Sequence, residues 1–182
     1  FYKDNKTNAY DILLLFHNQY VTQKEYDNLK QFVKNGGTIV FIDANALYAE
    51  VRYDRNNHTI TLVKGHDWQF DGKDARRSVH EKWYNESKIW TGGNYLVNTI
   101  ESNVTFANNP FNYTHSEEQF VNNPNATILA DYDIKFPKDF IQLYSKKEKL
   151  PAELQREDIP IENITVATYS MDYGKGKVIV LG

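Results

Sequence analysis

The spacing of apolar and polar positions changes at clear points along the first part of the chain, and each change predicts an element. Residues Tyr10–Phe16 form a nearly continuous apolar run, as in a strand buried on both faces of a parallel sheet. A polar loop follows, then apolar residues at helical spacing, then a second apolar run at Thr38–Ile42. The order strand, loop, helix, strand covers about 33 residues, which is the size of a βαβ crossover unit.

The helix between the two strands has recognisable ends. Thr22 and Glu25 have the spacing of a capping box, in which the threonine side chain accepts a hydrogen bond from the glutamate amide. Gly36-Gly37 ends the helix, because glycine readily adopts the left-handed conformation that follows a last turn. One helix face is predicted to pack on the sheet and a set of lysines is predicted to stay in water. The packing residues are Tyr26, Leu29, Phe32 and Val33, and the lysines are Lys24, Lys30 and Lys34.

The remainder of the chain has a weaker pattern. Alternation over His58–Val63 predicts a strand, and Ile164–Ser170 with Lys177–Leu181 predicts a hairpin around a glycine-bearing turn. The rest of residues 51–165 has no clean period and is interpreted as a long irregular insertion. The pattern therefore predicts a single domain over residues 1–182, a three-layer α/β fold with a mostly parallel sheet.

Composition agrees with a globular domain and excludes some partners. The chain has 182 residues, of which 41% are hydrophobic and 25% charged, and its net charge is −3. This balance gives no basic surface for nucleic acid. No apolar run approaches the roughly 18 residues of a membrane-spanning helix. Because the chain opens on Phe1 rather than on methionine, we expect it to be a piece of a longer protein with other domains.

Asparagine motifs indicate the cellular location of the protein. The chain has 19 asparagines, and the pattern Asn-x-Ser/Thr occurs seven times, whereas chance predicts about two occurrences. Such motifs accept N-linked glycans in proteins that pass a glycosylation machinery. With no cysteine and abundant Tyr, Asn and Lys, the composition favours an extracellular or cell-surface glycoprotein, with a hint of an archaeal source. The predicted glycosylation sites are Asn5, Asn57, Asn85, Asn103, Asn112, Asn125 and Asn163.

Two short motifs, together with the predicted elements, resemble a known family. His17-Asn18-Gln19-Tyr20 follows the first strand, and Asn45-Ala46-Leu47-Tyr48 follows the second. With the Gly-Gly stop and the glycine-bearing hairpin at residues 173–178, they resemble the class I glutamine amidotransferase-like (flavodoxin-like) fold. They are more similar to the C-terminal domain of the N,N-dimethylformamidase large (beta) subunit. The resemblance covers residues 10–51 and 166–182.

The amidotransferase likeness concerns the turn that follows the second strand. Amidotransferases carry a cysteine nucleophile there, and a chain without cysteine cannot form a thioester. Asp43 stands at the corresponding position. An aspartate there could attack a substrate or bind a metal, but turn chemistry favours the interpretation that it caps the turn.

The dimethylformamidase likeness implies a different chemistry, in which an iron held by two tyrosines and a glutamate activates water to hydrolyse an amide. Tyr20 and Tyr48 match the two tyrosines by motif; Glu81 is the first choice for the glutamate and Glu50 the second. Phenolate and carboxylate oxygens suit a hard, Lewis-acidic ferric ion. Loops after neighbouring parallel strands would bring the tyrosines together. Gln19 replaces the glutamate of the family's loop, which counts against catalysis.

Other constellations are weaker. His66-Asp67 and His80-Glu81 could hold a metal, but neither pair has a recognised ligand spacing. Trp68, Trp83 and Trp90 could line a sugar-stacking groove, although large aromatic side chains more often fill a core.

Two functions from different classes follow. The favoured one is a non-catalytic assembly or ligand-binding module without a cofactor, whose partners are N-linked glycans and other domains or surface proteins. The alternative is an iron-dependent amide hydrolase that uses Tyr20, Tyr48 and Glu81.

The excess of Asn-x-Ser/Thr motifs generates a prediction about the native protein. We expect several of the seven motif asparagines to carry glycans when the protein is isolated from its own source. Intact mass spectrometry before and after enzymatic deglycosylation measures this directly. A native chain with only the peptide mass would contradict the surface-glycoprotein interpretation.

Overall fold

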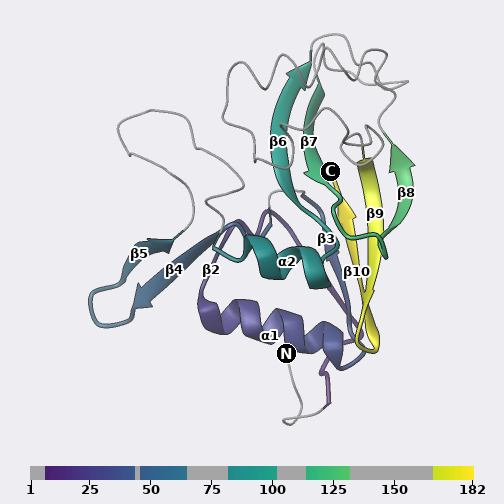
Figure 1. Ribbon diagram of the computed structural model, residues 1–182. Coiled ribbons are helices and arrows are strands. Elements are labelled where there is room, and N and C mark those ends of the chain that lie inside the picture. The colour runs from purple at the N-terminus through teal and green to yellow at the C-terminus, as the bar shows by residue number, and fades with distance from the viewer. Residues whose placement is uncertain (1–6, 44–45, 65–81, 102–113, 132–165) are drawn as a thin grey trace.

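A computed structural model describes residues 7–43, 46–64, 82–101, 114–131 and 166–182, and Figure 1 shows how their elements are arranged. The strands outnumber the helices in these segments. The elements in chain order are β1 (Ile12–Leu15), β2 (Tyr20–Val21), α1 (Gln23–Lys34), β3 (Thr38–Phe41), β4 (Ala49–Asp54), β5 (Thr59–Lys64), α2 (Tyr84–Trp90), β6 (Asn94–Glu101), β7 (Thr114–Phe120), β8 (Thr127–Asp131), β9 (Val166–Tyr173) and β10 (Gly176–Leu181).

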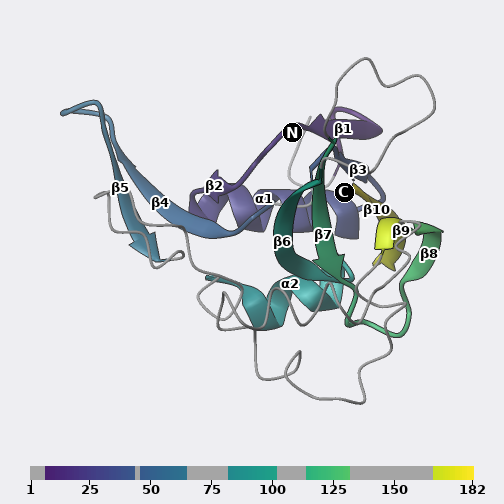
Figure 2. The ribbon, with the colours of Figure 1, turned by 90° about the horizontal axis from the view of Figure 1, so that it is seen from above.

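The described strands form two mixed sheets. The larger sheet has seven strands in the order β1-β3-β10-β9-β7-β6, with β8 also paired to β9, and the smaller has the order β2-β4-β5. In the larger sheet only the β1–β3 and β3–β10 pairs are parallel. Both described helices lie on the same side of it (Figures 1 and 2). The predicted three-layer, mostly parallel α/β fold of amidotransferase type is therefore wrong, because most of the sheet is antiparallel and the described helices cover one face.

The predicted crossover unit is confirmed. β1 pairs with β3 in parallel, with Leu15 opposite Phe41, and α1 connects them. The Thr22 hydroxyl accepts a hydrogen bond of 3.1 Å from the Glu25 amide, as the capping box requires. At the other end, Gly36 has φ 110°, and the amides of residues 36 and 37 donate to the carbonyls of Val33 and Phe32. This is a Schellman motif, so the Gly-Gly stop works as predicted.

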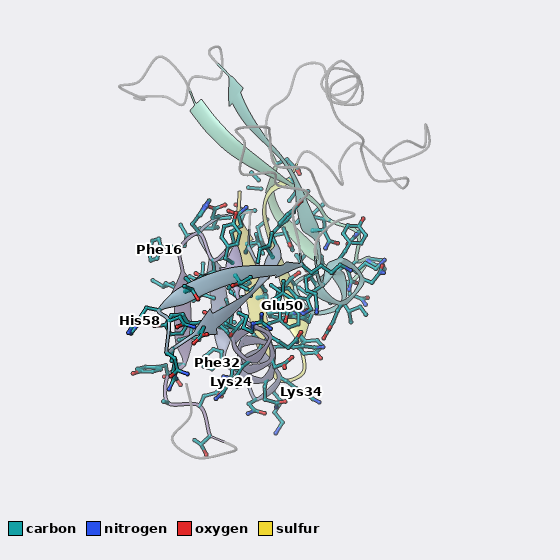
Figure 3. All side chains as sticks on the ribbon, turned by 90° about the vertical axis from the view of Figure 1, so that its left-hand side faces the viewer. Phe16, Lys24, Phe32, Lys34, Glu50 and His58 are labelled. Atoms are coloured by element: carbon teal, nitrogen blue, oxygen red, sulfur yellow. The ribbon has the colours of Figure 1, made fainter. Side chains whose placement is uncertain are left out.

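The predicted faces of α1 are confirmed with one difference. Tyr26, Leu29, Phe32 and Val33 are fully buried, and α1 packs against β3 and β10. Lys24 and Lys34 are exposed, as Figure 3 illustrates next to the buried Phe32. Lys30 is half-buried instead, because its ammonium pairs with the carboxylate of Glu86 on α2. This ion pair links the two helices.

Close packing explains two glycines. A Cβ on Gly37 would lie 2.2 Å from the ring of Phe32, and one on Gly176 would lie 2.2 Å from the Gly37 carbonyl oxygen. The end of α1, the start of β3 and the β9–β10 turn therefore pack too tightly for any side chain. The predicted C-terminal hairpin is confirmed, with antiparallel β9 and β10 and Gly174 in the left-handed region at its turn.

β1 differs from its prediction on one face. Leu13 and Leu15 pack against the core, but Ile12 and Leu14 are 58% and 57% exposed. The strand was predicted to be buried on both faces, and this is wrong for the described structure. The reason is that β1 forms one end of the larger sheet, and no helix in the described segments covers its outer face.

The stretch that was predicted to be an irregular insertion contains regular structure wherever it is described. The predicted strand at residues 58–63 is β5, which pairs with β4 in a hairpin that projects from the body of the molecule (Figures 1 and 2). β6, β7 and β8 extend the larger sheet. The helices in the described segments are too short or too polar to cross a membrane.

The packing of α1 generates a stability prediction. Phe32 is 0% exposed, so the substitution Phe32→Ala should lower the free energy of unfolding by about 3–5 kcal/mol through lost burial and a residual cavity. Lys34→Ala, on the exposed face of the same helix, should change it by less than about 0.5 kcal/mol. Denaturant unfolding of both variants gives the values; equal losses would contradict the assigned faces.

Candidate functional site

The candidate site lies where β1 and β3 end. Because these strands are parallel and in register, Leu15 and Phe41 reach the same edge of the sheet. The pairing extends one residue further, since the Ile42 amide donates a 2.9 Å hydrogen bond to the Leu15 carbonyl. The loop after β1 and the turn after β3 therefore start side by side. The carboxyl edge of parallel strands is the usual place for ligands in sheets of this kind.

Backbone hydrogen bonds then join the loop to the turn along their length. The Leu47 amide donates to the Asn18 carbonyl at 2.8 Å, and the amides of Tyr48 and Ala49 both donate to the Gln19 carbonyl at 3.0 Å. The contact continues into the smaller sheet, where Tyr20 pairs with Ala49 in parallel. The two sequence motifs are thus held together by main-chain atoms, which fixes their relative position independently of side-chain rotamers.

A histidine–aspartate pair stands at the start of this junction. The Nδ1 atom of His17 contacts the Oδ2 atom of Asp43 across 26 residues of sequence. The His17 side chain is 58% exposed and that of Asp43 is 16% exposed. Asp43 was predicted to cap the turn after the second strand, and its contact with His17 was not predicted. The available signal was that each polar side chain comes directly after one of two neighbouring parallel strands.

The backbone at the junction adopts uncommon conformations. His17 has φ 50° and Leu47 has φ 55°, both in the left-handed region. Histidine tolerates this region better than most residues, whereas leucine rarely adopts it. Leu47 is 2% exposed and belongs to the hydrophobic core, which holds it there. Sparsely populated backbone conformations cluster at functional sites.

The first motif tyrosine, Tyr20, begins β2, and the second, Tyr48, immediately precedes β4. Tyr20 is 41% exposed, and partial burial raises the pKa of its phenol. Tyr48 is 1% exposed and packs with Ala49 and Leu62. Tyr20 lies opposite Ala49, so Tyr48 is one residue out of register with it. Within a regular strand this offset would place the two side chains on opposite faces. Tyr48 lies just before β4, however, so the alternation of that strand does not fix the direction of its side chain.

The predicted carboxylates are placed only in part. Glu50 pairs with Lys82, with 2.5 Å between Oε2 and Nζ, and the Lys82 amide donates to the Tyr48 carbonyl. Figure 3 shows Glu50 on the projecting β4 strand. Within the described residues there is no group of three or more His, Cys, Asp or Glu side chains that could hold a metal. The first-choice glutamate, Glu81, and the residues His66, Asp67 and His80 lie outside the described residues.

The tryptophans that the structure describes belong to the core. The rings of Tyr26 and Trp83 are stacked with centroids 4.2 Å apart, and Trp90 Nε1 donates a 2.9 Å hydrogen bond to the Tyr26 hydroxyl. Burial raises the pKa of the Tyr26 phenol strongly. Trp83 and Trp90 are 4% and 0% exposed, so they fill the space between helices and sheet rather than line a groove. Trp68 lies outside the described residues.

The motif asparagines that the structure describes are all exposed. Asn57 lies in the β4–β5 turn, Asn85 on α2 and Asn125 in the turn before β8. Their side chains are therefore accessible to solvent, which glycosylation requires. The remaining ones, Asn5, Asn103, Asn112 and Asn163, lie outside the described residues.

Comparison with solved structures finds proteins to which this chain is similar in fold. The chain is similar to the catalytic mutant of a GH42 beta-galactosidase from G. stearothermophilus, with a TM-score of 0.50 and 15% identity over 97% of this chain and 19% of that chain. A beta-galactosidase from Bacillus circulans sp. alkalophilus has a TM-score of 0.46 and 11% identity over 94% of this chain and 20% of that chain. The chain spans about a fifth of these proteins, and such identities concern the fold alone.

Sequence comparison gives the family. Residues 3–135, well over half of the chain, match the family described as N,N-dimethylformamidase beta subunit-like, C-terminal. The chain belongs to this family, which confirms that part of the resemblance; the amidotransferase-like part is not confirmed. No curated protein matches the chain.

Proposed function

We propose that this chain is a domain of a metal-dependent amide hydrolase of the N,N-dimethylformamidase type, with Tyr20 and Tyr48 as iron ligands. One observation carries the proposal: the Gln19 carbonyl accepts the amides of Tyr48 and Ala49, which holds the two motif tyrosines on adjacent chain segments. Membership of the dimethylformamidase family supports the class of reaction.

The donor chemistry fits a ferric ion. Two phenol oxygens and a carboxylate are hard ligands, and a hard trivalent cation prefers oxygen donors. The left-handed backbone at Leu47 supports convergence of the phenols, because it frees the Tyr48 side chain from the alternation of a regular strand. The carboxylate would come from Glu81 or from Glu50, whose pairing with Lys82 is half-shielded from water. Iron would supply Lewis acidity toward the amide oxygen and toward water.

The chain's own residues position the reacting groups. The side of Tyr20 that remains exposed offers a polar edge to an entering substrate, and the buried Gln19 keeps the loop fixed. Because the junction is held by backbone hydrogen bonds, it is formed before ligands arrive. A preformed site avoids the ordering cost that a flexible one would incur on binding.

A non-catalytic ligand-binding or assembly module is the second candidate. The observation in its favour is Tyr48, which is 1% exposed and packs with Ala49 and Leu62 like an ordinary core residue. In that case Tyr20 alone would contribute to a surface that binds other domains, surface proteins or glycans.

We also propose that the protein works outside the cell or on its surface, as a glycoprotein. The excess of glycosylation motifs supports this location, and so does the exposure of Asn57, Asn85 and Asn125. The absence of cysteine and the composition support an archaeal source.

Iron analysis of the purified chain separates the two candidates. The amide hydrolase should bind about one iron per chain, show a visible phenolate-to-iron absorption band, and hydrolyse N,N-dimethylformamide. Tyr20→Phe and Tyr48→Phe should each lose most of the iron and the band, because each removes one ligand oxygen. Tyr53→Phe is the matched control, since Tyr53 is 47% exposed on the projecting hairpin. A chain without iron, band or activity would contradict the hydrolase and favour the binding module.

A further inference from the structure

We propose that Asn125 carries an N-linked glycan that shields the open edge of strand β8. The inference rests on the proposed glycoprotein character of the chain, and it adds which motif is modified and what the glycan does there. It comes from the position of the motif Asn125-Ala126-Thr127, which runs from an exposed turn into the first residue of β8.

Strand β8 has an unprotected edge. It pairs with β9 on one side, and no strand in the described segments pairs with its other side. All 5 of its residues are exposed, Ile128 by 37% and Leu129 by 55%, and Asp131 is its one charged residue. An edge with free main-chain groups and exposed apolar side chains can pair with a strand of another molecule, and such pairing leads to association.

The turn that carries Asn125 is held in a fixed position. The Asn123 side chain accepts a 3.0 Å hydrogen bond from the Asn125 backbone amide, and it donates one of 3.0 Å to the Lys88 carbonyl in the last turn of α2. The Ala126 amide donates to the Asn123 carbonyl at 3.1 Å, which closes a β-turn with Pro124 in its favoured second position. The turn therefore presents the motif asparagine on a rigid support.

Both side chains that define the motif are accessible in this turn. Asn125 and Thr127 are exposed, and neither side chain makes a hydrogen bond within the described part of the chain. The amide nitrogen of Asn125 can then form a bond to the anomeric carbon of a lipid-phosphate-linked oligosaccharide. The bond from that carbon to the phosphate oxygen breaks, the lipid phosphate leaves with one more negative charge, and the amide nitrogen loses one proton to water.

The other two described motifs are less open in the folded chain. Ser87, the hydroxyl residue of the Asn85 motif, is 5% exposed, and its Oγ atom lies 3.4 Å from the Tyr26 hydroxyl in the core. The Asn57 side-chain amide donates a 2.9 Å hydrogen bond to the Oδ2 atom of Asp54. An enzyme acting on the folded chain would have to unfold α2 or break that bond, whereas the turn before β8 requires neither change.

A glycan on Asn125 lies close enough to cover the apolar part of β8. Leu129 is four residues further along the chain, so the two Cα atoms are at most about 14 Å apart. A glycan is bulky and hydrated, so it occupies the space beside the strand and hinders the approach of a second strand. It would serve β8 as charged residues or covering loops serve other sheet edges.

Glycopeptide mass spectrometry of the protein from its own source tests the modification. Proteolysis after Glu118 and Asp131 releases a peptide in which Asn125 is the one motif asparagine. We expect higher occupancy at Asn125 than at Asn57 or Asn85. Glycans at other motifs with no higher occupancy at Asn125 would overturn this inference alone. A chain without a glycan at any of the seven motifs would overturn the proposed glycoprotein, and the inference with it.

Self-association of variants produced in the same source tests the role of the glycan. Asn125→Gln and Thr127→Ala should each lose one glycan mass and form larger species as concentration rises in sedimentation velocity, because the edge of β8 is uncovered. Thr127→Ser keeps the motif, so it should retain the glycan and sediment like the wild type. Variants that lose the glycan and still sediment like the wild type would overturn the proposed role.

A second substitution shows whether β8 is the strand that associates. Adding Leu129→Lys to Asn125→Gln should restore wild-type sedimentation, because a charge on an edge strand opposes pairing. Ile60→Lys is the matched control, since Ile60 is 69% exposed on β5 at the end of the smaller sheet, and it should not restore it. Equal rescue by both lysine substitutions would overturn the assignment of β8.

Discussion

The structure depends on the parallel pairing of β1 with β3. A parallel pair cannot be joined by a tight turn, so the chain must cross over, and α1 makes the crossing by burying Tyr26, Leu29, Phe32 and Val33 against the sheet. The pairing also decides where the site lies. Two parallel strands in register end at the same edge of the sheet. The register alone therefore brings together the polar residues that follow each strand.

The sequence predicted those parts of the fold whose signal is local. The capping box, the apolar face of α1, the Gly-Gly stop and the β9–β10 hairpin each depend on residues a few positions apart, and each is found. The prediction of the fold class was wrong because the local spacing of residues does not show which strands pair. β10 pairs with β3 in parallel, but β9 pairs with β10 in the antiparallel direction. The prediction for β1 was wrong for a similar reason. Its continuous apolar run predicts two buried faces, but the face with Ile12 and Leu14 is exposed.

The site was predictable in its chain segments but not in its contacts. The motifs ending at Tyr20 and Tyr48 were recognised, and the structure brings them together through the Gln19 carbonyl. The contact of His17 with Asp43 was missed because it joins residues 26 positions apart. A correct prediction needed the parallel register as an intermediate step, after which two polar residues at adjacent strand ends become neighbours.

The backbone strain at the junction argues that its geometry has a purpose beyond stability. A non-glycine residue in a sparsely populated conformation costs on the order of 1–3 kcal/mol, and both His17 and Leu47 adopt the left-handed region within the same junction. The hydrogen bond from the Leu47 amide to the Asn18 carbonyl and the burial of the Leu47 side chain offset part of that cost. A glycine at either position would relax the backbone, but would remove the imidazole or the core contact. The two strained positions of the junction are therefore the residue whose imidazole contacts Asp43 and the core residue that precedes Tyr48, so the strain lies where the loop after β1 meets the turn after β3.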